Sequence, residues 1–527
     1  MTYLFTNNQE IKNDIGNPLP ISRNTTTNST TNPIYIAGEI QTKPSGATTT
    51  TAFGELYGIQ LNPVIQLDAI YGLDPNKFET YNALGGGIDV DGPLIVCNTG
   101  TTQYGYGVIR SRRVVRYRPG QGALARFTAA FTTGVAGYTQ RAGLFNQEQA
   151  LQIGYDGTTF GVLRQNGGKA VIYKLQVTTA TNASQTVTIT LNGVAKNITV
   201  ISGTAAENAT VIGSQSFPGW VIEYTNTSVV FLSESVGPMN GLFAISSTGN
   251  FAGTLTQLQA GVAHTTNWTS QSSFNIDKLD GTGPSGVIID PTKLNVYQIN
   301  FRWLGVGEIR YAMEDPNNGD MIFFHHEHYT NRHTTPHLDN PSLKLGYVAA
   351  SLGGTGTNVI VTGASMMGGI EGNINTTSFP LAASNTRTTL NNSGTYYHLL
   401  SLHNRLILNN KINAREIILK SISTAANSSA STPVKFIIYK NPALDDPFVW
   451  NHVDDTWSAA SISTTASSLN PASLVSIYEI LVSPGAATTI DLTELRITIP
   501  ANTHISVVVV GSGVISQADV TLNWVED

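Results

Sequence analysis

Apolar and polar residues alternate with a period of two along most of the chain, which is the pattern of half-buried β-strands. In residues 123–131, for example, Ala125 and Phe127 alternate with Arg126 and Thr128. Successive side chains of a strand point to opposite faces, so such runs place one face on a core and leave the other polar. The pattern predicts an all-β protein made of several β-sandwiches.

Turn signals separate these runs. Asp156-Gly157 and Asn192-Gly193 each stand between two apolar-alternating segments, and these dipeptides favour the two-residue turns of β-hairpins. Residues 205–212 are the exception, because they indicate one short helix.

Changes in composition and in the spacing of apolar residues divide the chain into five regions. We predict an extended N-terminal arm, a split sandwich of the concanavalin-like type, a small α+β domain inserted into it, a polar linker, and a C-terminal sandwich or jelly roll. Their predicted bounds are 1–52 for the arm, 53–172 plus 265–375 for the split sandwich, 173–264 for the insert, 376–395 for the linker and 396–527 for the jelly roll.

Composition agrees with this interpretation. Charged residues make up 12% of the 527 residues, against about 25% in ordinary globular domains. The 50 glycines and 22 prolines, with abundant Thr, Ser and Asn, supply turns and strands rather than helices. These numbers exclude a helical bundle and disfavour a nucleotide-binding α/β fold.

Charge limits the partners. The net charge of −6 argues against a general nucleic-acid binder, which needs a basic face. One basic cluster alternates with apolar residues, as a strand over 112–117 would, and a polar strand face is favoured over a phosphate or sulfate site. The cluster consists of Arg110, Arg112, Arg113, Arg116 and Arg118.

Cysteine usage and the chain ends bear on the compartment. The one cysteine, Cys97, lies in an apolar run and excludes an internal disulfide framework. A chain of this size without disulfides is expected to assemble in a reducing cytoplasm. We find no signal-peptide pattern and no apolar stretch of about 18 residues, so we expect no membrane insertion.

Several segments together resemble virion structural proteins of tailed phages, especially phages of aquatic bacteria such as cyanobacteria. They cover most of 10–350, and no single segment is a chemical signature. The segments are 13–21, 113–121, 126–128, 141–144, 156–162, 275–290 with Leu279-Asp280-Gly281-Thr282-Gly283-Pro284-Ser285-Gly286, Trp303-Leu304-Gly305-Val306-Gly307, 335–341 and, more weakly, 522–527.

The resemblance implies a concanavalin-like sandwich and a role as a particle component, without any catalytic residue set or cofactor. A tail, baseplate or fibre-attachment protein is the expected role. The expected location is the virion, after assembly in the host cytoplasm. Expected partners are other virion proteins and further copies of the chain, with a trimer among the options. The alternatives are a carbohydrate- or receptor-binding module on the virion and a protein that decorates the capsid surface.

Candidate chemistry is densest in residues 325–337, which hold five of the ten histidines. On a strand, His326 and His328 share one face and can bind one metal ion if a third ligand approaches, for example from a symmetry-related copy. The alternative is a strand end with hydrogen-bonding histidines. Glu308 is a further candidate acid, and we expect nothing to pair with it locally.

Other candidates are weaker. Trp303 and Tyr329 are candidates for stacking on a sugar, as are Tyr104, Tyr106, Trp450 and Trp457, although such aromatics are more often core or interface. Three aspartate pairs are interpreted as turn residues in loops, and the first resembles a fragment of a calcium loop. They are Asp89 with Asp91, Asp445 with Asp446, and Asp454 with Asp455.

Overall fold

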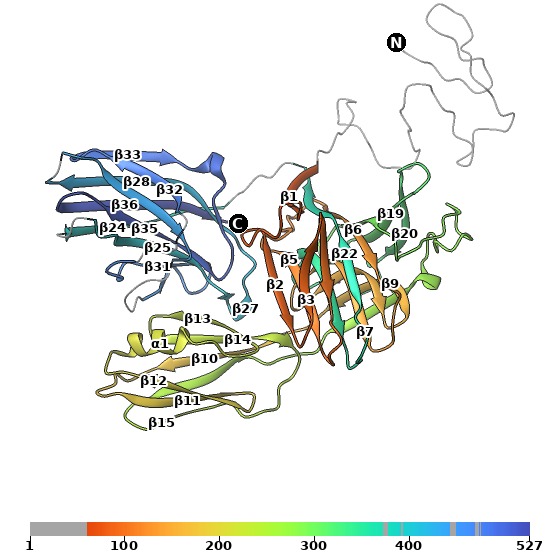
Figure 1. The fold of residues 1–527 in the computed structure, drawn as a ribbon, viewed down its shortest axis with the longest axis horizontal. Helices are drawn as coiled ribbons and strands as arrows, with labels where there is room; N and C mark the ends of the chain where they lie inside the picture. The colour runs from red at the N-terminus through yellow and green to blue at the C-terminus, as the bar shows by residue number, and fades with distance from the viewer. Residues whose placement is uncertain are drawn as a thin grey trace, which may run out of the picture. The chain divides into compact units, whose positions relative to one another are not determined.

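The computed structural model describes residues 61–372, 378–390, 394–429, 431–442, 449–469, 474 and 476–527. Residues Gln60–Asp527 form one compact unit, in which strands dominate and α1 (Ala205–Gly213) is the one α-helix of the described residues (Figure 1). Short 3-10 helices occur at Gln271–Ser273 and Thr493–Leu495. The predicted all-β class is confirmed, whereas the predicted arm lies outside the described residues.

Two antiparallel sheets form the split sandwich. The first sheet has the order β20-β19-β18-β6-β22-β4-β3, with β23 beside β6 and β1 beside β23. Its strands are β1 (Leu61–Asp68), β3 (Gly87–Asp91), β4 (Leu94–Asn98), β6 (Ala123–Phe131), β18 (Asn295–Phe301), β19 (Ile309–Glu314), β20 (Met321–Glu327), β22 (Ile360–Gly363) and β23 (Ser365–Glu371).

The second sheet of the split sandwich has the order β17-β9-β8-β7-β21-β5-β2. Its strands are β2 (Phe78–Ala83), β5 (Tyr106–Ser111), β7 (Tyr138–Phe145), β8 (Ala150–Asp156), β9 (Thr159–Asn166), β17 (Thr265–Ser270) and β21 (Lys344–Ser351). The predicted hairpin at Asp156-Gly157 joins β8 to β9. One core lies between the two sheets and is rich in aromatic rings, among them Phe127, Tyr297 and Tyr347.

The insert consists of seven strands and α1, and lies between β9 and β17 in the sequence. Its sheets have the orders β13-β14-β10-β16 and β12-β11-β15. The helix was predicted, and it begins with a capping box in which Thr204 and Glu207 bind each other's backbone N–H. The strands are β10 (Ala170–Val177), β11 (Gln185–Leu191), β12 (Val194–Val200), β13 (Trp220–Thr225), β14 (Ser228–Val236), β15 (Ala244–Ser247) and β16 (Gly253–Gln259).

The C-terminal region also forms two antiparallel sheets, with the orders β24-β36-β28-β33 and β30-β31-β25-β35-β29-β32; β34 also pairs with β28, and β26 pairs with β27. The strands are β24 (Pro380–Leu390), β25 (Tyr397–Asn404), β26 (Ile407–Leu408), β27 (Lys411–Ile412), β28 (Ile417–Ser428), β29 (Val434–Lys440), β30 (Asn451–His452), β31 (Ala460–Ser463), β32 (Ser476–Val482), β33 (Ala486–Asp491), β34 (Thr498–Ile499), β35 (Thr503–Val510) and β36 (Ile515–Glu526).

The order of these strands is that of a jelly roll. If β24, β25, β28, β29, β32, β33, β35 and β36 are numbered one to eight, one sheet reads 1-8-3-6 and the other 2-7-4-5. This is the arrangement of two Greek keys across two sheets. Aliphatic side chains from both sheets fill the core between them, together with Trp524.

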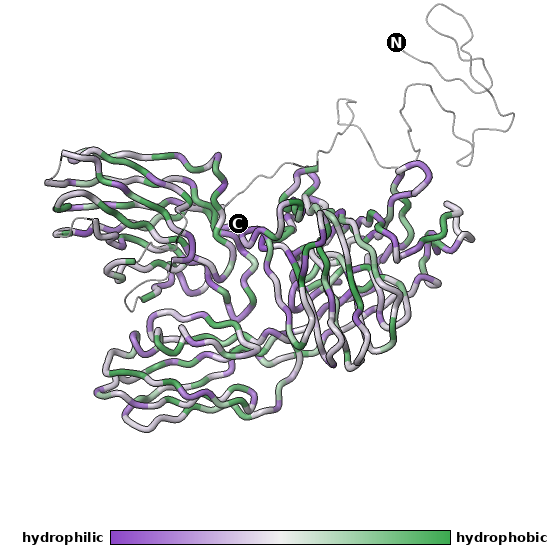
Figure 2. The backbone as a smooth tube through the Cα atoms, viewed as in Figure 1, coloured by the Kyte–Doolittle hydropathy of each residue, from purple (hydrophilic) through white to green (hydrophobic). Residues whose placement is uncertain are grey.

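The structure differs from the sequence prediction in two segments. Most of the predicted linker is β24, the first strand of the jelly roll. The predicted strand over 112–117 is absent, and Val115 makes a single bridge to Leu343 there. Elsewhere apolar and polar residues alternate along the strands (Figure 2). No helix in the described part of the chain is long and apolar enough to cross a membrane.

Candidate metal centre

Cross-strand pairing brings four polar residues to one face at the edge of the split sandwich. The pairs Ile309↔Glu327 and Arg310↔His326 fix the register of β19 and β20, so Glu308 and His328, one step further, face each other where the strands end. Directly opposite residues share a face, and so do residues two apart. Glu308 and Arg310 therefore lie on the same face as His326 and His328.

The two imidazoles converge on one carboxylate oxygen. Oε1 of Glu308 lies 3.2 Å from Nδ1 of His326 and 3.4 Å from Nδ1 of His328. One donor atom from each of these three residues lies within 4.8 Å of the others, and no other such group of His, Cys, Asp or Glu occurs in the part of the chain that the structure describes. The expectation that nothing pairs locally with Glu308 is wrong, because Arg310 lies two residues away and His326 and His328 belong to the next strand along the chain and its end.

Two arginines bind the other oxygen of the same carboxylate. Oε2 of Glu308 accepts from Arg310 at 2.5 Å and from Arg302 at 3.2 Å. Burial raises the pKa of Glu308, but the hydrogen bond and charge of Arg310 and the nearby histidines outweigh it, so the pKa lies below its usual value. Burial lowers the pKa of His326, although Glu308 opposes the shift. Glu308 therefore favours the ionised carboxylate, the form that a metal ligand needs and a general acid does not.

The other histidines of 325–337 do not join this group. His325 points to the opposite face, where its ring lies 6.0 Å from that of Tyr311, and burial lowers its pKa to about 4. His337 is buried, which likewise lowers its pKa to about 4. His333 stacks on Tyr329 with ring centroids 3.8 Å apart.

Two of the residues predicted to stack on a sugar, Trp303 and Tyr329, already pack against other rings of this chain. Tyr329 is buried beneath His333. Trp303 donates its indole N–H to the carbonyl of Leu338 at 2.9 Å and packs edge-to-face on Tyr117. Glycan contact by Trp303 and Tyr329 stays a prediction, and the burial of Tyr329 argues against it. Tyr104, another residue predicted to stack on a sugar, is exposed to solvent.

The aspartate pairs behave as local polar residues where they are described. Asp89 and Asp91 lie on strand β3, not in a loop as expected. Asp454 caps a turn by accepting from the backbone N–H of Thr456 at 2.7 Å, and Asp455 pairs with His452 at 2.6 Å. Asp445 and Asp446 lie outside the described residues.

Four of the five arginines of the basic cluster pair with carboxylates of this chain, whereas Arg112 donates to the carbonyl of Pro75. Only Arg110 lies on a described strand, β5. Arg110 and Lys344 pair with Glu79 in the split sandwich. Arg113, Arg116 and Arg118 instead face acids of the jelly roll, and the partners are Glu416 at 3.4 Å for Arg113, Asp527 at 3.9 Å for Arg116, and Asp527 for Arg118. A phosphate or sulfate would have to compete with these carboxylates.

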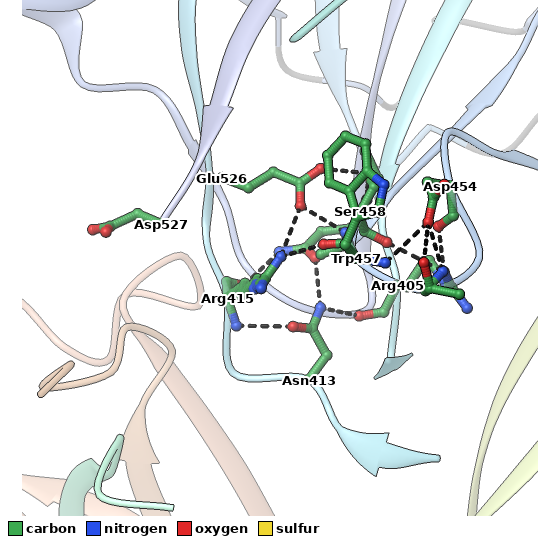
Figure 3. Close-up of polar contacts among 12 residues, drawn as sticks. Arg405, Asn413, Arg415, Asp454, Trp457, Ser458, Glu526 and Asp527 are labelled. Carbon is green, nitrogen blue, oxygen red and sulfur yellow. Dashed lines mark hydrogen bonds and ion pairs between the residues drawn. The ribbon is translucent and has the colours of Figure 1, made fainter. Parts of the chain in front are cut away.

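A second polar network lies beside Asp527 at the end of the jelly roll (Figure 3). Glu526 accepts from Ser458 Oγ at 2.6 Å and pairs with Arg415 at 3.5 Å, and Asn413 binds the carbonyl of Arg405 at 2.6 Å. Because the described partners of these groups belong to the chain itself, the network reads as structural support. Cys97 lies elsewhere, in the core of the split sandwich. Its burial raises the pKa of the thiol to about 12, which disfavours the thiolate that a nucleophile needs.

Comparisons with known proteins add little. No family model matches the chain, and no curated protein matches it. Similar solved structures include the metal-free carbohydrate recognition domain of Emp46p, with 6% identity, a TM-score of 0.22 and coverage of 59% of this chain and 97% of that one. For a legume lectin-like domain from Entamoeba histolytica the values are 10%, 0.22, 57% and 95%. For a lectin from Bauhinia forficata in complex with GalNAc they are 9%, 0.20, 58% and 97%.

TM-scores this low do not establish a shared fold. The sandwich and jelly-roll assignments rest on the sheet orders and cores given above. The resemblance to phage virion proteins likewise stays a prediction.

Proposed function

We propose that this chain is a structural subunit of a virus particle that acts by binding other subunits rather than by catalysis. The observation that carries the proposal is the open edge of the jelly roll at β24. The segment resemblance and the 12% charge agree with it, because charged residues are depleted at the cores of permanent interfaces.

Strand β24 is long and has a partner on one side only. Its eleven residues pair with β36 over almost their full length, and no other described strand pairs with its outer edge. Sheet edges in monomeric proteins are usually protected by charges, proline or bulges, because a free edge can pair with another chain.

The sequence of β24 provides little such protection. Arg387 is its one charged residue, and its guanidinium points inward to the carbonyl of His398 at 2.7 Å. Pro380 stands at the first position, while the exposed side chains further along include Ala382, Ser384 and Thr386. This edge suits strand addition by a segment of a neighbouring subunit, and residues 1–52 of another copy are the segment we favour.

Localisation in the particle is the first test. Particles purified from an infected host should contain the chain in stoichiometric amounts, and density for the jelly roll should be found in a cryo-electron microscopy map. A chain that stays in the soluble host extract and is missing from particles would contradict the proposal.

Blocking the edge is the second test. Ser384→Lys places a charge on the exposed face of β24 and should lower incorporation into particles by at least tenfold, while changing the free energy of unfolding by less than about 0.5 kcal/mol. Thr521→Lys is the matched control, because Thr521 is the cross-strand partner of Ser384 on β36, which has a strand on both sides. Normal incorporation of Ser384→Lys would exclude this edge as the contact.

A second candidate is a module that binds a host surface glycan, and one observation favours it. Tyr104 is 57% exposed at a loop end of the split sandwich, its backbone N–H donates to Ser351 Oγ at 3.2 Å, and Leu352 beside it is exposed as well. Aromatic rings held in this way can stack on sugars. Specific binding on a glycan array that is lost in Tyr104→Ala would support this function, and binding unchanged in that variant would contradict it.

A further inference from the structure

We infer that Glu308, His326 and His328 bind one divalent transition-metal ion of the zinc class, with a fourth position open to water. The inference is independent of the proposed function. It rests on the register of two strands, the distances among three donor atoms and the exposure of one ligand.

The ligands are held in place before an ion arrives. The backbone of His326 is bound on its outer side by Asn275, which accepts from the N–H at 2.9 Å and donates to the carbonyl at 2.8 Å. Glu308 is oriented by the two arginines on Oε2, so that Oε1 is left to face the imidazoles. Hydrogen bonds to the second oxygen of a carboxylate commonly orient a metal ligand in the way seen for Glu308.

The distances fit ligands of one ion better than they fit charge-assisted hydrogen bonds. Such bonds between an N–H donor and a carboxylate are about 2.7–2.9 Å long, whereas the two Nδ1 atoms lie 3.2 and 3.4 Å from Oε1. Around a tetrahedral ion with bonds of about 2.0–2.1 Å, neighbouring ligand atoms are about 3.3–3.4 Å apart.

The chemistry of the donors selects the class of ion. Imidazole nitrogen suits zinc, cobalt, nickel and copper, whereas calcium and magnesium prefer oxygen ligands alone. The side chain of His328 is 48% exposed, which leaves the fourth position to solvent. Arg302 and Arg310 repel a cation, but solvent screens them because their side chains are 63% and 41% exposed.

The test is a titration of the full-length chain, first freed of metal with a chelator. Zn²⁺ should bind at one ion per chain by calorimetry, and Co²⁺ should give the visible absorption of a four- or five-coordinate ion. Glu308→Gln, His326→Gln and His328→Gln should each weaken binding at least tenfold. Ca²⁺ should not displace cobalt.

The matched control is His452→Gln, because His452 has a carboxylate partner in Asp455 but belongs to no group of three donors among the residues that the structure describes. It should bind zinc like the native chain. His328 is the most exposed ligand, so His328→Gln should retain the native circular dichroism even if another variant does not fold. The inference is overturned if the native chain binds no zinc, if His328→Gln binds it unchanged, or if calcium competes at equal concentration.

Discussion

The split sandwich and the jelly roll are both built of two antiparallel sheets, but their interiors differ. The sandwich core contains the rings of Phe127, Tyr297 and Tyr311. The jelly-roll core is mainly Leu, Ile and Val, and buried polar groups such as His398 and Ser401 lie beside it. The two cores therefore differ in their apolar side chains, aromatic in one and aliphatic in the other. Both have polar contacts between their sheets: Tyr347 donates to the carbonyl of Thr128 in the split sandwich, and the edge strand β24 supplies such donors in the jelly roll.

Strand β24 shows how the second arrangement works. Its inward side chains include Asn385, which donates to the carbonyl of Leu399 at 2.6 Å, and Arg387, which donates to carbonyls of His398, Ala466 and Ser467. Polar side chains thus replace part of the apolar packing, and each donates to carbonyl groups on the opposite side of the sandwich.

The largest effect is expected for the aromatic core. Phe127→Ala should lower the free energy of unfolding of the split sandwich by about 3–5 kcal/mol, because a fully buried ring leaves a cavity that its neighbours cannot fill. Urea denaturation followed by circular dichroism measures the change. Tyr71→Ala is the control, since Tyr71 is exposed, and a loss below about 1 kcal/mol for Phe127→Ala would break the comparison.

The next effect tests the polar interior of the jelly roll. Arg387→Met should cost about 2–3 kcal/mol, because it keeps an aliphatic stem but removes the hydrogen bonds of the guanidinium to three carbonyls. Hydrogen exchange of the β25 and β31 amides should accelerate before that of the split sandwich. Equal protection in both variant and native chain would show that these hydrogen bonds contribute little.

A buried carboxyl at the border of the jelly roll gives a pH-dependent effect. Glu223 of the insert accepts from the backbone N–H of Leu406 at 3.1 Å, and burial raises its pKa to about 7, against about 4.3 in an unfolded chain. The folded chain therefore holds this proton more tightly. The stability that the group contributes is fully present below about pH 4.3 and is lost as the pH rises through about 7.

Replacing this carboxyl should remove that dependence. Glu223→Gln should raise the free energy of unfolding by about 1–2 kcal/mol at pH 8 and leave it nearly unchanged at pH 4. Thermal melts at both pH values provide the measurement. An equal change at both values would mean that the buried charge is not the cause.

The smallest effect concerns the outer face of β24. Thr386 donates to Asp519 at 2.6 Å on the exposed side, so Thr386→Val should change stability by less than about 0.5 kcal/mol. Comparison of its denaturation midpoint with that of Arg387→Met separates the two faces of a single strand. If Thr386→Val lowered stability more than Arg387→Met, the exposed face of β24 would contribute more to stability than the inward face, contrary to this prediction.

The same contrast explains what could be predicted from the sequence. Strands of the split sandwich and the hairpins at Asp156-Gly157 and Asn192-Gly193 were predictable, because their inward positions are apolar. The sequence of β24 predicts a linker instead, since both faces of the strand carry mostly small or polar side chains and apolar residues do not alternate clearly with polar ones. The jelly-roll order itself follows from long-range pairing that no local pattern contains.

The candidate metal centre was half predictable. The spacing of His326 and His328 on one strand face was visible in the sequence. The third donor was not, because Glu308 becomes their neighbour only through the register of β19 and β20. Glu308 and Arg310 are polar residues two apart at the start of β19. This spacing puts both on one strand face, and it is the sequence signal that could have pointed to a partner for the histidines.

The insert enters and leaves the split sandwich at adjacent points. Asn166, the last residue of β9, is the cross-strand partner of Thr265, the first residue of β17. The 98 residues between them thus occupy the place of an ordinary hairpin turn. An insert of this kind can change in length or sequence without altering the order of the strands that flank it. The surface of the chain can therefore vary at this one site while the sheet that contains β9 and β17 stays the same.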